Sequence, residues 1–256
     1  MPGRRMHWTE DGVPSSASTP VGASRHKDNR RARRVRRAIR TLKRLPGRGL
    51  VGLVRVHRHV DRTTGAVALT FDDGPDPEHT PQVLDELARL GIVATFFLVG
   101  HRARAHPQIV RRMVDEGHAV GSHSDSHPEP WSVPLPRLIR EYYRGRTHVE
   151  QAARQPVRLF RPPKGYVDGR GAVAMRTVRL RPWLWTIDPG DWVPDVTPGD
   201  IMAALDPLVG GDVVLLHDAI EGPLATSALD RSATVAVLPE IAALAARRGL
   251  RFTTLS

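Results

Sequence analysis

The stretch Ala-Val-Ala-Leu-Thr-Phe-Asp-Asp-Gly-Pro at residues 66–75 sets the organisation of the chain. Its short apolar run predicts a buried strand over Val67–Phe71, and the run ends in two adjacent carboxylates followed by the turn formers Gly74 and Pro75. After Thr64 such runs alternate with segments of helical periodicity, which is the pattern of βα units around a parallel sheet. The sequence therefore predicts an α/β fold.

We expect seven parallel strands in a chain whose 256 residues suit one barrel-type domain, since such a domain commonly takes about 250 residues. The other six predicted strands are Ile92–Leu98, His118–Gly121, Val157–Phe160, Trp183–Ile187, Val213–Leu216 and Arg251–Thr254. Proline stands in the expected first helical turns and glycine near the expected helix ends, as helix punctuation predicts. These residues are Pro81, Pro107, Pro198, Gly91 and Gly117.

The composition excludes several classes of protein. Without cysteine the chain has no disulfide framework, thiolate metal site or cysteine nucleophile, so a metal would need histidine and carboxylate ligands. The longest nearly apolar stretch, residues 91–100, is shorter than the roughly 18 residues of a membrane-spanning helix. Residues 1–28 are polar and lack the apolar core of a signal peptide. The sequence predicts a protein that is cytoplasmic or peripheral at the membrane.

The positive charge lies in the N-terminal arm, residues 1–60, which we separate from a catalytic domain at residues 61–256. The arm holds 16 basic and 3 acidic residues. We expect residues 1–28 to be disordered and Arg30–Arg44 to form an amphipathic helix. This helix would attach to an anionic membrane surface or cell-wall polymer, or would be a solvated helix packed on the domain. Nucleic acid is not favoured, because no aromatics interleave the arginines.

Polar clusters follow five of the predicted strands. Because the carboxyl ends of parallel strands meet on one face of the fold, we expect these clusters to lie together. The clusters are Asp72-Asp73-Gly74, His123-Ser124-Asp125-Ser126-His127, the run from Arg161 to Tyr166, Asp188 to Trp192, and His217-Asp218.

The residue types in these clusters suit a hydrolytic metal site. Asp72 and Asp73 alone are typical of a turn, and His123 and His127 alone could be surface residues. If residues 123–127 were helical, their spacing would place both imidazoles on one side. Two imidazoles and the carboxylate of Asp73 would make a three-ligand zinc site with an open position, which leaves Asp72 free to act as a base.

The motifs together resemble those of the polysaccharide deacetylase family, which has the NodB-homology domain and forms carbohydrate esterase family 4. The resemblance covers Val67 to Ser256 and implies a distorted (β/α) barrel that removes N-acetyl groups from amino-sugar polymers with Zn²⁺ or another divalent metal such as Co²⁺. In chain order the motifs are Thr-Phe-Asp-Asp-Gly-Pro-Asp at 70–76, His-Ser-x-x-His at 123–127, Arg-Pro-Pro at 161–163, Asp-x-x-Asp-Trp at 188–192 and Leu-Leu-His at 215–217.

The resemblance also implies a role for each motif residue. Asp73, His123 and His127 would hold the metal. Asp72 would be the general base that takes a proton from the attacking water, and Arg161 would keep it ionised and oriented. His217 would be the general acid, held by Asp191, which would raise the pKa of its imidazole.

The predicted substrate-binding residues come from the same resemblance. The backbone N–H of Lys164 would stabilise the developing oxyanion, and Trp192 would form a wall of the acetyl pocket. The remaining predicted contacts are Pro163, Gly165, Tyr166 and Leu216. Lys164 stands where the family often has an aromatic residue, so it would alter which sugar or anionic group is accepted. Val214 replaces the first leucine of the last motif.

We therefore expect a polysaccharide deacetylase that acts on peptidoglycan-like or chitin-like glycans. One alternative is a deformylase or deacylase of a lipid-linked amino sugar or a small amide, which would suit a basic arm at the membrane. Another is an inactive glycan-binding module, although the chain retains the base, the acid and all three metal ligands. The sequence does not predict an oligomeric state.

Overall fold

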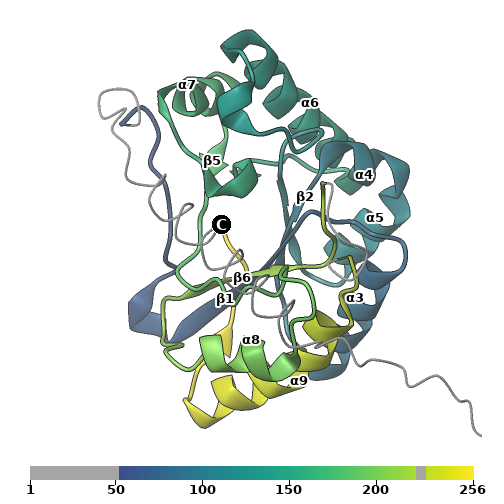
Figure 1. The fold of residues 1–256 in the computed structure, drawn as a ribbon, viewed down its shortest axis with the longest axis vertical. Helices are drawn as coiled ribbons and strands as arrows, with labels where there is room; N and C mark the ends of the chain where they lie inside the picture. The colour runs from purple at the N-terminus through teal and green to yellow at the C-terminus, as the bar shows by residue number, and fades with distance from the viewer. Residues whose placement is uncertain (1–51, 223–228) are drawn as a thin grey trace, which may run out of the picture. The chain divides into compact units, whose positions relative to one another are not determined.

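The computed structural model describes residues 52–222 and 229–256, which form a curled half-barrel of parallel strands surrounded by helices (Figure 1). The sheet order is β5-β4-β3-β2-β1-β6, and β7 pairs with the start of β1. The distorted (β/α) barrel with seven parallel strands is confirmed. The strands are β1 Ala66–Asp72, β2 Thr95–Leu98, β3 Ala119–Ser122, β4 Leu159–Phe160, β5 Arg181–Pro182, β6 Val213–His217 and β7 Arg251–Phe252.

The strand register brings the predicted polar clusters to one end of the sheet. Asp72, the last residue of β1, pairs with Phe97 on one side and with His217 on the other. Ser122 of β3 pairs with Phe160 of β4, so the residues that follow these two strands also leave the sheet at neighbouring points. The carboxyl ends of β1, β3, β4 and β6 therefore carry the candidate site.

The predicted strand Trp183–Ile187 is wrong, because the strand at this edge, β5, ends at Pro182. The segment that follows crosses from the β5 edge to β6 and pairs only where it reaches each side. Trp183 forms a single parallel bridge with His57, and Ile187 forms another with Val214 of β6. This crossing brings the open edges of the half-barrel together without a continuous ladder.

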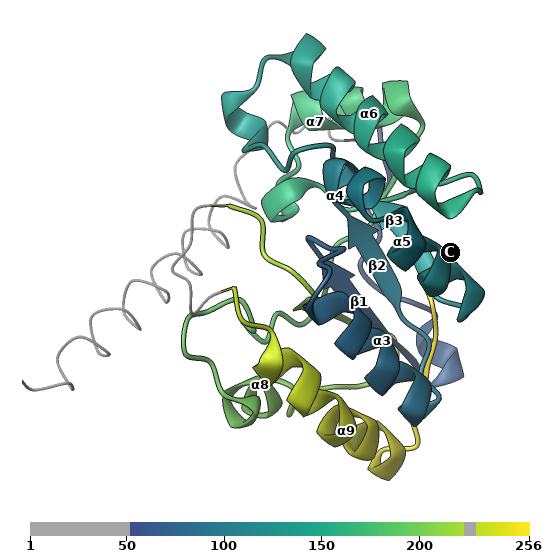
Figure 2. The same ribbon diagram turned by 90° about the vertical axis from the view of Figure 1, so that its right-hand side faces the viewer.

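Helices cover the outside of the sheet, with α8 and α9 below it and α6 and α7 above it in Figures 1 and 2, and with α3 on its right-hand side in Figure 1. Their ends follow the predicted punctuation: Pro107 and Pro198 begin helices, and Gly91 ends α3 in a left-handed conformation at φ 66°. The α-helices are α3 His79–Leu90, α4 Gly100–Ala105, α5 Pro107–Asp115, α6 Leu135–Ala153, α7 Gly169–Val178, α8 Pro198–Ala204 and α9 Ser232–Arg247. Short 3₁₀ helices are η1 Arg62–Thr64, η2 Pro130–Ser132 and η3 Pro163–Gly165.

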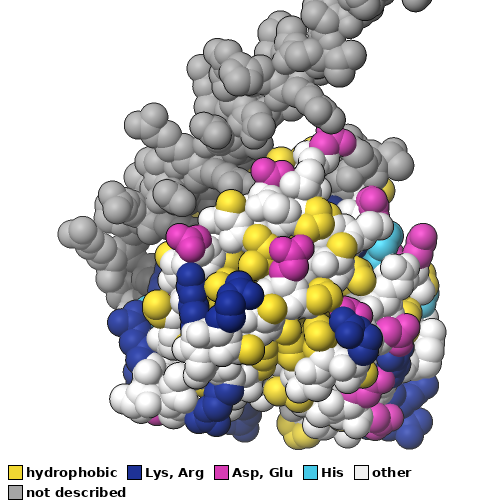
Figure 3. Space-filling view, turned by 90° about the horizontal axis from the view of Figure 1, so that it is seen from below, with side chains coloured by type: hydrophobic (Ala, Val, Ile, Leu, Met, Phe, Trp, Pro, Cys, Tyr) yellow, Lys and Arg dark blue, Asp and Glu magenta, His cyan; other side chains and the backbone are white. Residues whose placement is uncertain are grey.

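Side-chain alternation divides the apolar residues of the strands between two clusters. Leu69 and Leu216 belong to the large core that the sheet forms with the outer helices. Ala68, Phe97 and Val213 pack with Trp183 on the other side of the sheet, inside the curl of the half-barrel. Seen from below, the side on which α8 and α9 lie in Figure 1, the molecular surface carries hydrophobic side chains between charged ones (Figure 3).

The N-terminal predictions fall mostly outside the described residues. The expected disorder of residues 1–28 and the expected helix Arg30–Arg44 lie outside them. Within the described part, His57 donates its backbone N–H to Pro182 and Val60 donates to Gly211. The last residues of the predicted arm thus hydrogen-bond to the barrel. No helix among the described residues is long and apolar enough to cross a membrane.

Candidate active site

The carboxyl ends of the strands gather a buried set of charged side chains, and most predicted site residues belong to it. Asp72 ends β1 and Asp73 follows it, the histidine pair follows β3, Arg161 follows β4, and His217 ends β6. Asp191 comes from the loop after the crossing segment. Buried charges persist in folded proteins when they are paired or hold a metal, so this gathering marks a functional site.

Asp73, His123 and His127 form the candidate metal centre, and their ligand atoms all lie within 4.8 Å of one another. Asp73 Oδ1 is 3.4 Å from His123 Nε2 and 3.6 Å from His127 Nε2. Asp73 Oδ2 accepts a hydrogen bond from the backbone N–H of Glu221 at 2.9 Å, whereas the buried Oδ1 has no hydrogen-bond partner among the described residues. An unpaired buried carboxylate oxygen is costly, so this donor set fits a divalent cation.

The protonation of the two histidines suits metal binding. His123 donates its Nδ1–H to the backbone carbonyl of Arg161 at 2.6 Å, which leaves the Nε2 lone pair facing Asp73. Burial lowers the pKa of His123 to about 4, and burial likewise lowers the pKa of His127 to about 4. Both imidazoles are therefore neutral near pH 7, as metal ligands must be.

The histidine pair does not lie on a helix, so the helical interpretation of its spacing is wrong. Residues 123–127 form a loop in which Ser124 and His127 have φ values of 72° and 48°, and the ring centroids are 4.8 Å apart. Ser124 Oγ accepts the backbone N–H of His127 at 3.0 Å. Gly145 of α6 packs so closely that an added Cβ would lie 2.3 Å from the Ser124 backbone. A tight turn thus replaces the helix.

Asp125, between the two histidines, connects this loop to α6. Its carboxylate accepts a hydrogen bond from His148 at 2.7 Å and lies 3.3 Å from Arg144 Nε. The sequence placed Asp125 in a polar cluster without a role and gave no signal for His148 or Gly145, since these roles depend on where α6 packs.

Asp72 is paired with Arg161 as predicted, although the pKa of the carboxyl moves in the other direction. Arg161 Nη1 donates to Asp72 Oδ1 at 2.8 Å and to Thr70 Oγ1 at 2.7 Å. The guanidinium is fully buried, 4.2 Å from the centroid of the Phe97 ring. Burial raises the pKa of Asp72, and the opposing charges of Arg161 and His217 only reduce this rise. A carboxylate with a raised pKa is a stronger base.

His217 is held by Asp191 on two sides. Its Nδ1 is 2.8 Å from Asp191 Oδ1, and its backbone N–H donates to Asp191 Oδ2 at 2.8 Å. Burial by itself would lower the pKa of His217, but the charge and hydrogen bond of Asp191 raise it to about 9, with smaller contributions from Asp73 and Asp72. The imidazole is therefore a cation near pH 7 and carries a proton that it can donate.

Two further residues hold Asp191 and were missed in the sequence analysis. Thr234 Oγ1 donates to Asp191 Oδ2 at 2.9 Å, and Arg231 Nη1 donates to the backbone carbonyl of Asp191 at 2.9 Å. Both lie at the start of α9, at least 40 residues away from Asp191 in the chain, so no local pattern could have indicated them.

The predicted substrate-binding residues differ in how far they are buried. Pro163, Lys164 and Gly165 form η3 beside Arg161, and the Lys164 side chain is exposed. Gly165 has φ 62°, and an added Cβ would lie 2.5 Å from the Trp185 ring, so only glycine fits there.

Of the remaining predicted substrate contacts, two are partly buried and one is fully buried. Trp192 is partly buried, and its Nε1 is 3.4 Å from Asp188 Oδ1. Tyr166 follows η3 and is also partly buried. Leu216 is wrong as a substrate contact: it is fully buried in the outer core, because strand side chains alternate. Leu215 lies on the same side of β6 as His217.

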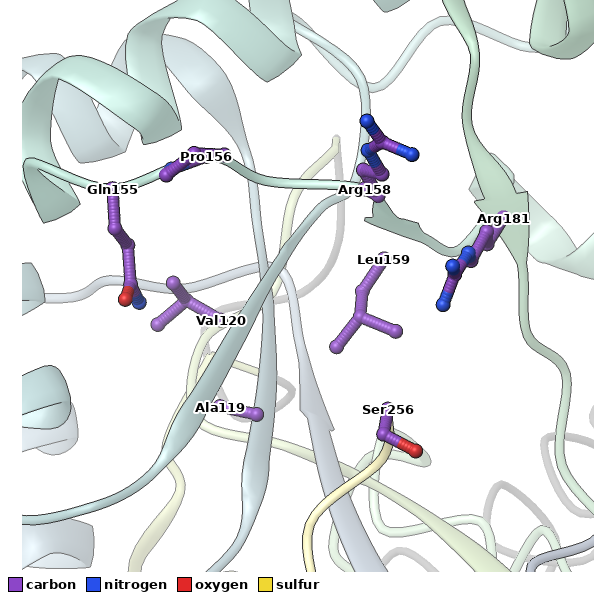
Figure 4. Close-up of a pocket in the computed structure, with 8 residues that line it drawn as sticks. All are labelled: Ala119, Val120, Gln155, Pro156, Arg158, Leu159, Arg181 and Ser256. Atoms are coloured by element: carbon purple, nitrogen blue, oxygen red, sulfur yellow. The ribbon is translucent and has the colours of Figure 1, made fainter.

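A cavity of about 380 Å³ lies elsewhere, among the first residues of β3, β4 and β5 (Figure 4). Its walls include Ala119, Leu159 and Arg181 and none of the predicted site residues. The starts of these strands are at the opposite end of the sheet from the metal ligands, so the cavity is separate from the candidate active site.

Sequence comparison links the chain to characterised enzymes. The sequence profile of a family described as polysaccharide deacetylase matches residues 59–183. A peptidoglycan-N-acetylglucosamine deacetylase of Bacillus cereus is 35% identical over 192 residues, which cover 74% of this chain and 86% of that enzyme. A chitooligosaccharide deacetylase of Sinorhizobium fredii is 36% identical over 183 residues, covering 70% of this chain and 85% of that enzyme.

Solved structures show the same likeness. A crystal structure of a peptidoglycan N-acetylglucosamine deacetylase with a bound N-oxidanyl-benzamide has a TM-score of 0.72 and 30% identity, and the match covers 80% of this chain and 92% of that one. A family 4 carbohydrate esterase from Streptomyces lividans in complex with acetate has a TM-score of 0.66 and 31% identity, with coverage of 75% and 93%.

Proposed function

The chain belongs to the polysaccharide deacetylase family and is a hydrolase of the carbon–nitrogen bond in N-acetylated glycans, and we propose that it does this chemistry with the buried set described above. One observation carries the proposal: an Asp–Arg pair, a His–Asp pair and a three-residue metal centre lie together at the carboxyl ends of the strands. Hydrolysis of an unactivated amide needs a base for water and an acid for the leaving amine, and both are present.

Asp73, His123 and His127 would hold a divalent metal, for which we propose Zn²⁺. A bound zinc ion would polarise the acyl carbonyl and increase the acidity of the attacking water. The neutral state of both imidazoles and the unpaired Asp73 Oδ1 support this assignment.

Asp72 would accept a proton from water as the water oxygen adds to the acyl carbon. Its hydrogen bond from Arg161 fixes one carboxylate oxygen, so the other, Oδ2, is directed towards the metal centre at 3.7 Å from His123 Nε2. The backbone N–H of Lys164 would share the negative charge on the acyl oxygen.

His217 would donate its proton to the amide nitrogen as the carbon–nitrogen bond breaks. The products are then acetate and a free amino sugar. Asp191 keeps the imidazole oriented and charged, which matches the raised pKa of about 9. We propose that Trp192 lines the acetyl pocket and that Pro163, Gly165 and Tyr166 contact the glycan.

We propose that the substrate is a peptidoglycan-like or chitin-like glycan, because the similar enzymes include deacetylases of both kinds. The structure with bound acetate agrees with acetate as the product. The ammonium group of Lys164 is exposed and close enough to His127 to lower the pKa of that imidazole. A cation at this position favours a substrate that carries an anionic group near the amide.

The product acid tests the function. The zinc-loaded full-length protein is expected to release acetate from N-acetylglucosamine oligomers or peptidoglycan fragments, with acetate and formate measured separately. Formate alone, released from a lipid-linked formamido sugar, would overturn the glycan assignment in favour of the lipid-linked alternative. Release of neither acid from any of these substrates would contradict the proposed activity.

We further propose that the basic arm attaches the enzyme to an anionic surface, supported by the 16 basic residues among the first 60. Deleting residues 1–50, which spares His57 and Val60, is expected to abolish retention on vesicles rich in anionic lipid or on an anionic cell-wall polymer, while acetate release from a short soluble oligomer persists. A full-length variant in which Arg33, Arg34 and Arg36 are changed to Gln loses three positive charges. It should be retained less than the wild type and more than the truncated chain. Retention of the truncated chain equal to wild type would refute the attachment.

A further inference from the structure

We infer that Trp131 and Tyr166 form an aromatic platform that binds the sugar ring next to the unit being deacetylated. The platform would make the preferred substrate an oligosaccharide of at least two units rather than a single amino sugar. This inference rests on the proposed function, because it assigns the glycan a second contact beside the same site.

The two aromatic rings meet although they come from different loops. Their centroids are 5.2 Å apart and their planes cross at 73°, an edge-to-face contact that fixes the orientation of both rings. The Trp131 side chain is 40% exposed, whereas Tyr166 is partly buried. Tyr166 therefore supports Trp131 from the protein side, and one surface of the indole stays open to a ligand.

Hydrogen bonds hold the loop of Trp131 in place. Arg170 of α7 donates from Nη2 to the backbone carbonyl of Trp131 at 3.1 Å and from Nη1 to that of Val133 at 3.4 Å. Val133 is buried in the apolar cluster between α6 and α7. Because these contacts order the Trp131 loop before a ligand arrives, they reduce the entropy lost on binding.

The platform residues come from the loops that also carry the metal ligands and Lys164. Trp131 is four residues after the metal ligand His127, and Tyr166 is two residues after Lys164. Both loops follow β3 and β4, which lie on one side of β1, while His217 lies on β6 at the other side. A glycan with its amide at the metal centre would thus extend over the β3 and β4 loops towards the indole.

A pyranose ring is the chemical group that fits this surface. It offers a flat face of C–H groups to a planar aromatic side chain while its hydroxyl groups stay in water, and exposed tryptophan and tyrosine are typical anchors of such amphipathic contacts.

Kinetics on oligomers of increasing length test the platform. In Trp131→Ala, kcat/KM for a tetramer of N-acetylglucosamine is expected to fall by about tenfold, mainly through KM, and this loss should exceed the loss for the monosaccharide by at least about fivefold. Trp131→Phe should recover most of the tetramer activity because it keeps a flat ring. Tyr143→Ala, at an exposed aromatic residue of α6 outside the platform, is the matched control and should behave as wild type.

A binding measurement separates the platform from the proposed function. Calorimetry with Asp72→Asn, which removes turnover, should show tetramer binding that becomes about tenfold weaker when Trp131→Ala is added. Equal affinity with and without Trp131, or no tetramer binding at all, would overturn the platform. If the wild type released acetate from no glycan but Trp131-dependent binding remained, the proposed function would fail and the platform would stand.

Discussion

Asp72→Asn is expected to abolish turnover, by about 10²–10⁴-fold in kcat, while the chain keeps its metal and its fold. Asparagine has the shape of aspartate, and its amide oxygen can still accept the hydrogen bond that Arg161 donates at 2.8 Å. Its amide nitrogen cannot take a proton from water. None of the three candidate metal ligands is changed, so zinc content should match that of the wild type.

A matched control is available on another strand. Asp212→Asn changes a buried carboxylate that accepts the backbone N–H of Val209, just before the start of β6 and at the end of that strand opposite His217. This variant should retain wild-type kcat. Near-normal acetate release by Asp72→Asn, measured beside this control, would remove Asp72 as the base.

Asp73→Ala is expected to weaken zinc binding by more than about a hundredfold and to remove activity with it, since losing a ligand should cost more than losing an outer hydrogen-bond partner. Asp73 Oδ1 is the carboxylate atom shared by His123 and His127 at 3.4 Å and 3.6 Å. Two neutral imidazoles alone are an incomplete site for zinc. Metal content after dialysis, measured by elemental analysis, gives the result without any activity assay.

Asp76→Ala is the control for this variant, because Asp76 is a nearby carboxylate that caps the start of α3 and is outside the metal centre. It should bind zinc as the wild type does. If Asp73→Ala kept full zinc at wild-type affinity, the ligand assignment would be wrong. Circular dichroism of both variants checks that the barrel is intact.

The parallel sheet and the composition of the site could be predicted from sequence for the same physical reason. Buried parallel strands are nearly continuous apolar runs, so Val67–Phe71 and Val213–Leu216 can be identified as strands from the sequence. The polar residues that directly follow such runs must lie at the same end of a parallel sheet. Asp72 and His217 are therefore neighbours across β1 and β6, although 145 residues separate them in the chain.

Other features depended on packing that local patterns do not contain. The crossing segment from Trp183 to Ile187 has the apolar character of a strand, but the gap between β5 and β6 leaves it only single bridges. Leu216 was assigned to the substrate site by the family resemblance, whereas alternation along β6 turns its side chain to the core. The platform tryptophan gave no sequence signal, because its importance comes from contact with Tyr166 in a separate loop.

The metal dependence of acetate release tests the central claim most directly. The protein would be stripped with a chelator, titrated with zinc, and assayed on an N-acetylglucosamine oligomer at each point. A zinc site made by Asp73, His123 and His127 predicts no acetate from the stripped chain and a rate that rises until about one zinc ion is bound per chain. An undiminished rate in the fully stripped protein would contradict the account.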